Sequence, residues 1–339
     1  MSFVLNVETV GSSTNNENRK EIDWDARSEY LVEKAGTANG PEAMIGIVSG
    51  IVDLGLQQQE DAKMEWKGDE QSEIEELEKN DKQYFETLPN DKGVPTRYKR
   101  WAVKPCQQVA ITIDFPDVQV NNDQFFVDED TGIEHPLRQV LNGEFYQKGI
   151  GKIVGKPYNL KETRNDDGTW SIKNNTILFK LAQAVGGVLD HKGLLKPAYL
   201  GNLLGKAALF DVDISINESG GKKYLNEKIK LNGQVPKAMQ KMIPELDASY
   251  IYGVNFKGAQ DKEVLKNLRQ SVVTTMSLAT NFEGSDVQKA LIEIGKIKGV
   301  QQASVGDQDK EESPTPAPKA KAAPQPAPNF DDFDDQIPF

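Results

Sequence analysis

The strongest constraint on the fold is a pair of segments in which apolar and polar residues alternate. Residues 206–216 have the sequence KAALFDVDISI, and residues 224–235, YLNEKIKLNGQV, repeat the alternation. The stretch between them, NESGGKK, contains the glycines and polar residues that are typical of a turn. Successive side chains of a strand point to opposite faces of a sheet, so the two segments predict a β-hairpin with one buried face.

Segments before this hairpin predict further strands and two helices. Residues 107–115, QQVAITIDF, alternate and end before Pro116, as a strand should. Glycines break residues 151–160 at a spacing typical of bends, and residues 164–172 contain the tight-hairpin signal Asp-Asp-Gly. The two segments expected to be helical are residues 175–189 and 197–205.

The order of these segments predicts the fold class. Strands, then a helix, then a strand hairpin is the order of a small Greek-key barrel of the OB type, whose helix lies between the third and fourth strands. We therefore expect an α+β fold with an OB-like Greek-key β-barrel core and flanking helices. The flanking helices are expected at residues 40–68, 72–88, 261–279 and 285–299.

Composition excludes several classes of protein. No stretch approaches the roughly 18 to 20 apolar residues of a membrane span, and the first ten residues lack the basic start and long apolar run of a signal peptide. The single cysteine, Cys106, excludes an internal disulfide framework and a cysteine-cluster zinc site. We therefore expect a cytoplasmic protein with no membrane partner.

The net charge of -12 is unevenly distributed along the chain. Residues 1–90 carry 8 Lys and Arg against 20 Asp and Glu, residues 301–339 carry 3 against 8, and residues 91–300 carry 29 against 24. Phosphate binding needs a local basic surface rather than a basic protein, so the mildly basic middle is compatible with nucleic acid. The acidic stretch at residues 60–86 is expected to be a solvated helix face, or to repel phosphate and confine DNA to one side.

Catalytic signatures are weak. The two histidines, His135 and His191, lie outside any recognisable metal or nucleophile motif, and no phosphate-cradling GxxxxGK[ST] loop is present. Asp211 and Asp213 share one face of the predicted hairpin, a spacing that could hold a metal for nuclease chemistry. The simpler alternative, which we favour, is that they line the solvent face of an amphipathic strand. We therefore predict a protein that is not an enzyme and uses no cofactor or metal.

Basic and aromatic residues are interleaved in three places, at residues 94–105, 145–158 and 222–230. Single-stranded DNA requires this combination, because cations follow the phosphates and aromatic faces stack on any unpaired base. Trp170 is a further aromatic candidate. Each aromatic could instead pack in the core, and a single lysine could simply be solvated. The candidate DNA-binding residues are Arg97, Tyr98, Lys99, Arg100, Trp101, Lys104, Lys148, Lys152, Lys156, Tyr158, Lys222, Lys223, Tyr224, Lys228 and Lys230.

The last residues of the sequence predict a tethered docking peptide. Residues 301–329 contain six prolines and six alanines without apolar periodicity, which predicts a disordered linker with a reach of about 30 Å. The acidic residues 330–339 follow and close in Ile337, Pro338 and Phe339. An aromatic ring with a free carboxylate can anchor in an apolar pocket beside a cation, and the aspartates can steer it there.

The closing sequence DDFDDQIPF resembles the C-terminal acidic tip of bacterial-type single-stranded DNA-binding proteins, a run of aspartates that ends in Ile-Pro-Phe. Gln336 stands where those tips usually have an acid. The body is longer than that of the common bacterial protein, so the chain is similar to the diverged members encoded by bacteriophages. The tip residues that match are Asp331, Asp332, Asp334, Asp335, Ile337, Pro338 and Phe339.

The resemblance implies a protein that binds and protects single-stranded DNA during replication, recombination and repair, in the cytoplasm of a bacterial host. The tip would recruit partner enzymes, such as a polymerase, helicase, nuclease or recombination mediator, and could compete with DNA for the groove. A homo-oligomer is compatible with this function. The alternatives are a strand-annealing recombination protein, an acidic decoy that acts through the tip, and, less favoured, a metal-dependent nuclease.

These observations divide the chain into four expected regions. An acidic, partly helical N-terminal region covers residues 1–90, and an OB-like DNA-binding core with C-terminal helices covers residues 91–300. The disordered Pro/Ala-rich linker is residues 301–329, and the acidic partner-docking tip is residues 330–339.

Overall fold

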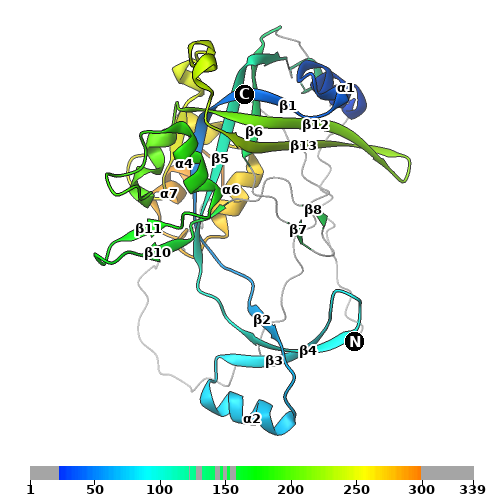
Figure 1. Ribbon diagram of the computed structural model, residues 1–339, viewed down its shortest axis with the longest axis vertical. Coiled ribbons are helices and arrows are strands. Elements are labelled where there is room, and N and C mark those ends of the chain that lie inside the picture. Colours follow the sequence, from blue (N-terminus) through cyan, green and yellow to red (C-terminus); the bar gives the residue numbers. More distant parts are fainter. Residues whose placement is uncertain are drawn as a thin grey trace, which may run out of the picture.

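The computed structural model describes residues 23–121, 123–126, 132–141, 146–147, 151–152 and 158–298. It has a mixed α+β fold with a large, mostly antiparallel sheet, which confirms the expected class (Figure 1). The predicted linker and acidic tip lie outside the described residues. Among the helices of the described ranges, none is long and apolar enough to cross a membrane.

The main sheet has the strand order β13-β12-β1-β5-β6, and each neighbouring pair along this path is antiparallel. Its strands are β1 (Glu42–Gln57), β5 (Cys106–Val120), β6 (His135–Leu141), β12 (Ala207–Ser219) and β13 (Lys222–Gly233). Two short strands join it, β9 (Tyr158–Asn159) beside β5 and β14 (Tyr252–Val254) parallel to β1. The predicted hairpin is confirmed as β12–β13.

The two longest strands change neighbours along their length, which curls the sheet. One edge of β1 pairs with β12 over residues 42–47 and with β14 over residues 50–52. The register with β5 shifts twice along β1, as at β-bulges, which bend a strand and increase its twist. Among the described strands no ladder joins β6 to β13, so the sheet is not a closed barrel; instead the amide of Gln139 donates to Glu227 at 3.0 Å.

The main core lies inside this curl. Ile111 and Ile113 of β5 face Phe210 and Val212 of β12, and all four side chains are fully buried. The residues between them point to the opposite face of the sheet, where Thr112 is also buried and contacts the hydroxyl of Tyr252 at 3.0 Å. The helices α1 (Trp24–Lys34) and α4 (Ile177–Val185) pack against the same core, and α4 confirms the helix predicted at residues 175–189.

A second core lies on the other side of β1. The helices α5 (Lys262–Lys266), α6 (Gln270–Ser277) and α7 (Asp286–Glu293) cover β14 and the second half of β1. The helix predicted at residues 261–279 is therefore two helices. Gly55 has a φ of +78°, and a Cβ there would lie 2.4 Å from the ring of Phe256, so only glycine fits.

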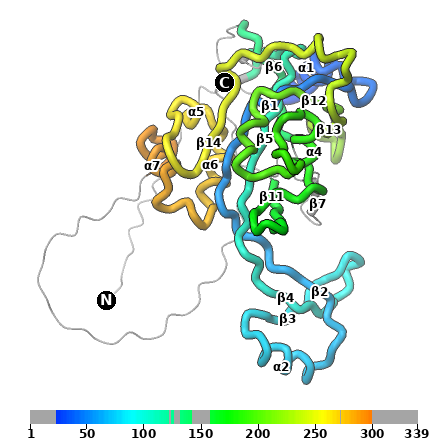
Figure 2. Tube along the Cα trace, turned by 60° about the vertical axis from the view of Figure 1, so that its left-hand side comes forward, coloured from blue at the N-terminus to red at the C-terminus, as the bar shows by residue number. Residues whose placement is uncertain are grey.

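Residues 58–105, which we call the arm, project away from the main sheet between β1 and β5 (Figures 1 and 2). A small antiparallel sheet in the order β2-β4-β3 forms the arm together with α2. Neither hydrophobic core contains a residue of the arm. The arm elements are β2 (Ala62–Glu65), α2 (Glu70–Lys79), β3 (Gln83–Pro89) and β4 (Pro95–Trp101).

Shorter elements complete the described chain. The hairpin β10–β11 matches the signal at residues 164–172, and η2 is the second predicted helix in 3-10 form. The shorter elements are η1 (Thr37–Asn39), α3 (Asp123–Phe126), β7 (Tyr146–Gln147), β8 (Gly151–Lys152), β10 (Glu162–Arg164), β11 (Trp170–Ile172), η2 (Pro197–Leu203), η3 (Lys237–Met242) and η4 (Ala248–Tyr250).

Three predictions of secondary structure were wrong. The helix predicted at residues 40–68 is instead β1 and β2, because both faces of β1 are covered and the resulting continuous apolar run resembles a buried helix. The helix predicted at residues 72–88 ends at Lys79, and β3 follows. The strand predicted to end before Pro116 continues to Val120, because its pairing with β6 is interrupted after Phe115 and resumes at Gln119.

The boundary predicted at residue 90 falls inside the arm, between β3 and β4. The supposed N-terminal region also supplies β1, a central strand of the same sheet as β5. The main sheet is therefore built from both sides of that boundary.

Candidate nucleic-acid interface

The first candidate cluster lies on β4, the central strand of the arm. Because side chains alternate along a strand, Arg97, Lys99 and Trp101 share one face, and Tyr98 and Arg100 share the other. The arm as a whole is not basic, since residues 58–105 contain twelve acidic and nine basic residues. What the cluster can bind therefore depends on the partners of each cation.

Helix α2 covers the first face of β4 with carboxylates. Arg97 donates two hydrogen bonds to Glu73, at 2.9 and 2.6 Å, and Lys99 forms an ion pair with Glu76 at 2.5 Å. These cations hold the pKa of Glu73 and of Glu76 below the usual range of a glutamate. Two of the predicted phosphate-binding cations are thus already paired with anions of the same arm.

The second face of β4 combines cations with tyrosines. Lys63 lies 5.3 Å from the centre of the Tyr98 ring, and Arg100 lies 5.5 Å from the centre of the Tyr84 ring. Arg100 also forms an ion pair with Glu86 at 2.7 Å. A cation over a ring is a favourable arrangement, and the ring of Tyr84 is 39% exposed.

Trp101 and Lys104 lie where β4 leaves the arm. The indole of Trp101 is partly exposed at the end of the strand, and Lys104 is exposed in the connection to β5. Lys104 has no ion pair within the described ranges, unlike the three cations of β4. These two residues are therefore the accessible members of the predicted 97–104 cluster.

The second candidate cluster is a row on the outward face of β13. Lys222, Tyr224, Lys228 and Lys230 occupy alternate positions of one strand, so their side chains share a face. The ring of Tyr224 is 52% exposed. In the part of the chain that the structure describes, none of the three lysines forms an ion pair. The row thus offers cations without ion pairs beside an exposed aromatic ring, and Asp211 and Asp213 stand opposite two of these lysines on the same face.

Lys223 lies on the opposite face of β13 from this row. It forms an ion pair with Glu29 of α1 at 2.9 Å, which raises the pKa of the lysine. Of the five residues predicted in this segment, four therefore face outward, and the fifth, Lys223, holds the hairpin to α1.

The third candidate cluster is the least defined. Lys148 and Lys156 lie outside the described residues, and Lys152 is part of β8. Tyr158 belongs to the main core and is only 9% exposed, and its burial raises the pKa of the phenol. A buried ring cannot stack on a base, so Tyr158 does not belong to the candidate interface.

The described parts of the three clusters lie along the long axis of the molecule. In both views β12–β13 lies towards one end, the arm forms the other, and β7–β8 lies between them (Figures 1 and 2). A linear ligand could contact several of these surfaces at once.

One further cationic site lies on the main sheet and was not predicted from the sequence. Arg138 of β6 donates two hydrogen bonds of 2.8 Å to the fully buried Asp114 of β5. The rings of Tyr250 and Tyr252 lie 5.8 and 5.4 Å from its guanidinium group. Asp114 and Arg138 are distant in sequence and meet through the pairing of β5 with β6, and β14, which pairs with β1, brings Tyr252 beside them. No local motif could have revealed this site.

The nuclease alternative receives no structural support from the hairpin. Asp211 and Asp213 stand opposite Lys230 and Lys228 on the outward face, and Asp211 accepts a hydrogen bond of 2.7 Å from Asn232. Over the described ranges, the structure contains no group of three or more His, Cys, Asp or Glu side chains that could hold a metal ion.

Comparison with known proteins identifies no relative. No family model matches the chain, and neither the curated proteins nor the solved structures contain a significant match. The function is therefore inferred from the residues themselves.

Proposed function

We propose that this protein binds and protects single-stranded DNA without strong sequence preference, during replication, recombination and repair. The observation that carries the proposal is the outward row of β13, where Lys222, Lys228 and Lys230 are free of ion pairs and Tyr224 is exposed. Cations that follow phosphates, together with an exposed ring that stacks on any base, suit an unpaired strand better than a duplex.

The topology of the main sheet supports an OB-like core. The strands β1, β5 and β6 follow one another in the sheet, α4 comes next, and the β12–β13 hairpin returns to β1. This is the OB order, in which the first-to-second and fourth-to-fifth strand connections contribute to oligonucleotide binding. Here those connections are the arm, which carries the first candidate cluster, and the turn of β12–β13, which directly precedes the row on β13.

The acidic tip supports a role in recruitment. We propose that Phe339, with Ile337 and the aspartates before it, docks into enzymes of replication and repair. The Pro/Ala-rich linker would let this peptide reach partners while the core remains on DNA. The protein would then act in the cytoplasm of a bacterial host, as a coating protein with no catalytic activity of its own.

The decisive experiment measures fluorescence anisotropy of a labelled oligo-dT strand with the full chain, as a function of salt. For single strands, the logarithm of affinity falls with the logarithm of salt by about 0.7 for each neutralised phosphate. The triple variant K222Q/K228Q/K230Q is therefore expected to weaken binding and to reduce this slope by about 2. A flat salt response, or equal affinity for duplex DNA, would contradict the proposal.

A matched variant controls for net charge. K237Q/K241Q/K257Q removes the same charge from exposed lysines outside the candidate clusters and is expected to retain most of the affinity. A chain truncated after residue 300 tests the decoy alternative, since a decoy would lose all of its binding. Under our proposal the truncated chain keeps or gains DNA affinity and loses only the recruitment of partners.

A further inference from the structure

The hairpin β10–β11 presents an exposed tryptophan that the candidate clusters do not include. The indole of Trp170 is 54% exposed, whereas the next two residues of β11, Ser171 and Ile172, are buried. The amide of Ile172 also donates to the carbonyl of Leu195 at 2.8 Å. The strand is thus anchored immediately beside the tryptophan, although the large apolar ring itself stays in solvent.

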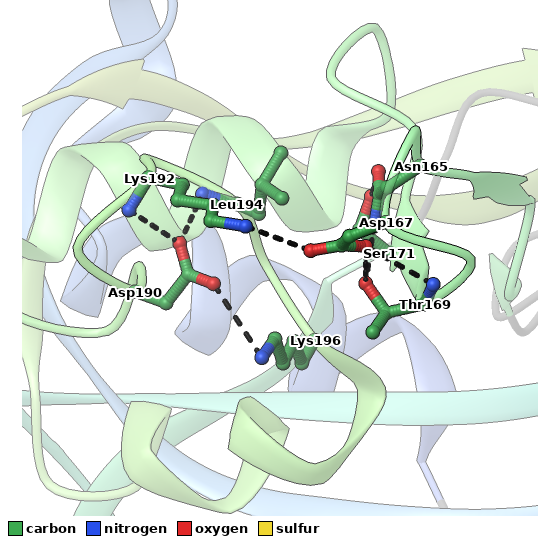
Figure 3. Close-up of polar contacts among 8 residues, drawn as sticks. All are labelled: Asn165, Asp167, Thr169, Ser171, Asp190, Lys192, Leu194 and Lys196. Atoms are coloured by element: carbon green, nitrogen blue, oxygen red, sulfur yellow. Dashed lines mark hydrogen bonds and ion pairs between the residues drawn. The ribbon is translucent and has the colours of Figure 1, made fainter.

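Polar contacts hold the turn of this hairpin in place (Figure 3). Asp167 accepts hydrogen bonds from the backbone amide and the hydroxyl of Thr169, at 3.1 and 2.6 Å. It also forms an ion pair of 2.7 Å with Lys192, which belongs to the neighbouring loop. The hydroxyl of Ser171 donates to Asn165 across the hairpin at 2.9 Å.

The neighbouring loop is itself fixed. The backbone amides of Lys192 and Leu194 each donate to Asp190 at 2.9 Å, and Lys196 approaches the same carboxylate at 3.6 Å (Figure 3). The β10–β11 hairpin is therefore held at its turn and at the base of β11. A ligand that meets Trp170 meets a ring on a positioned backbone, which lowers the entropic cost of binding.

One exposed cation stands beside the exposed ring, and two more lie at the base of the hairpin. Arg164 stands directly opposite Trp170 in the register of the hairpin, and its side chain is exposed. Lys161 and Lys173, joined by a backbone hydrogen bond of 2.8 Å at the base of the hairpin, are also exposed. None of these three cations forms an ion pair in the described chain, whereas the acidic Asp167 is already paired with Lys192.

We propose that Trp170 and Arg164 form a further contact site for single-stranded DNA, in which the indole stacks on an unpaired base and Arg164 binds an adjacent phosphate. This inference rests on the proposed function. Figures 1 and 2 place β10–β11 between β12–β13 and the arm along the long axis. A strand that binds the core could therefore extend over this hairpin towards the arm.

The test compares W170A with W24A in the full chain, by anisotropy on oligo-dT. Trp24 is a matched control, because its ring is 50% exposed and lies 5.9 Å from an arginine, Arg27, on α1. Removal of one stacked base contact weakens binding by about 5- to 150-fold. We expect this loss for W170A, little change for W24A, and recovery of most affinity for W170F, which keeps an aromatic face.

Two further measurements make the outcome decisive. Thermal unfolding of W170A should match that of the parent chain, because the exposed ring supports no core. If the alanine variant is destabilised, W170L, which keeps an apolar side chain without an aromatic face, tests stacking instead and is expected to lose affinity. R164Q should reduce the salt slope by about 0.7, in line with one lost phosphate contact. If the parent chain binds oligo-dT but both W170A and R164Q bind equally well, the inference fails and the proposed function stands. If the parent chain does not bind, both fail.

Discussion

At the scale of single residues, burial decides whether a side chain acts in the core or in the interface, and Tyr158 lies in the core. Its hydroxyl is buried and has no hydrogen-bond partner among the described residues. A buried polar group without a partner costs about 1 to 3 kcal/mol. We expect Tyr158→Phe to raise the free energy of unfolding by about 1 kcal/mol, measured by urea denaturation, and to leave the affinity for oligo-dT unchanged. If the variant loses DNA affinity while its stability is unchanged, Tyr158 contacts DNA after all.

A second residue-scale prediction concerns Asp53, which accepts hydrogen bonds from the amide of Gly55 at 2.9 Å and from the side chain of Gln107. Burial raises its pKa above the ordinary value of 3.8 despite these donors. The folded state therefore binds more protons than the unfolded state between these two pKa values. In that window the stability contributed by Asp53 falls as the pH rises.

The measurement for Asp53 is urea denaturation of the parent chain and of Asp53→Asn over a series of pH values. We expect the difference in unfolding free energy to shift in favour of the variant as the pH rises through 3.8 towards the folded pKa, and then to level off. A difference that does not change with pH would show that the carboxylate titrates alike in both states.

At the scale of elements, helix α2 determines which cations of the arm already have an anionic partner. Its carboxylates Glu73 and Glu76 pair with Arg97 and Lys99, and no side chain of α2 is fully buried. The variant E73Q/E76Q removes the anionic partners of both cations, whose side chains are 42% exposed for Arg97 and 14% exposed for Lys99. We expect higher affinity for oligo-dT and a salt slope steeper by up to about 1.4.

The control for this prediction lies on the same helix. E75Q/E78Q removes the same charge from two exposed glutamates that form no ion pair in the described structure. If both double variants raise the affinity equally, the effect is one of long-range charge and the pairing with β4 is irrelevant. A larger gain in affinity for E73Q/E76Q than for E75Q/E78Q would show that the two ion pairs keep Arg97 and Lys99 from binding DNA.

The elements also show how far the sequence alone could predict this structure. The β12–β13 hairpin was predictable, because one buried face produces a period of two in the sequence. The strand β1 was not, since burial on both faces removes that period. The row of Lys222 to Lys230 followed from the hairpin, whereas the pairing of Arg97 with Glu73 depends on how α2 folds back onto β4. Pairings between distant segments leave no local signal.

At the scale of the whole molecule, the arm can be separated from the fold that carries it. The ladder between β1 and β5 continues to the pair of Gln57 and Cys106, so the two strands lie side by side where the arm begins. Gln59 is needed on the core side, because it accepts a hydrogen bond of 2.8 Å from Asn159. A short turn could therefore replace residues 60–102 without breaking either hydrophobic core.

We expect the chain with residues 60–102 replaced by Gly-Ser-Gly to fold with nearly the parent free energy of unfolding. Closure of a short turn differs from closure of a long loop by only about 1 to 2 kcal/mol. Its affinity for oligo-dT should fall, and titration should show fewer nucleotides covered per protein, because Trp101 and the tyrosines of β4 and β3 are removed. A folded variant that covers the same length of DNA would show that the single strand runs over the main sheet alone and never reaches the arm.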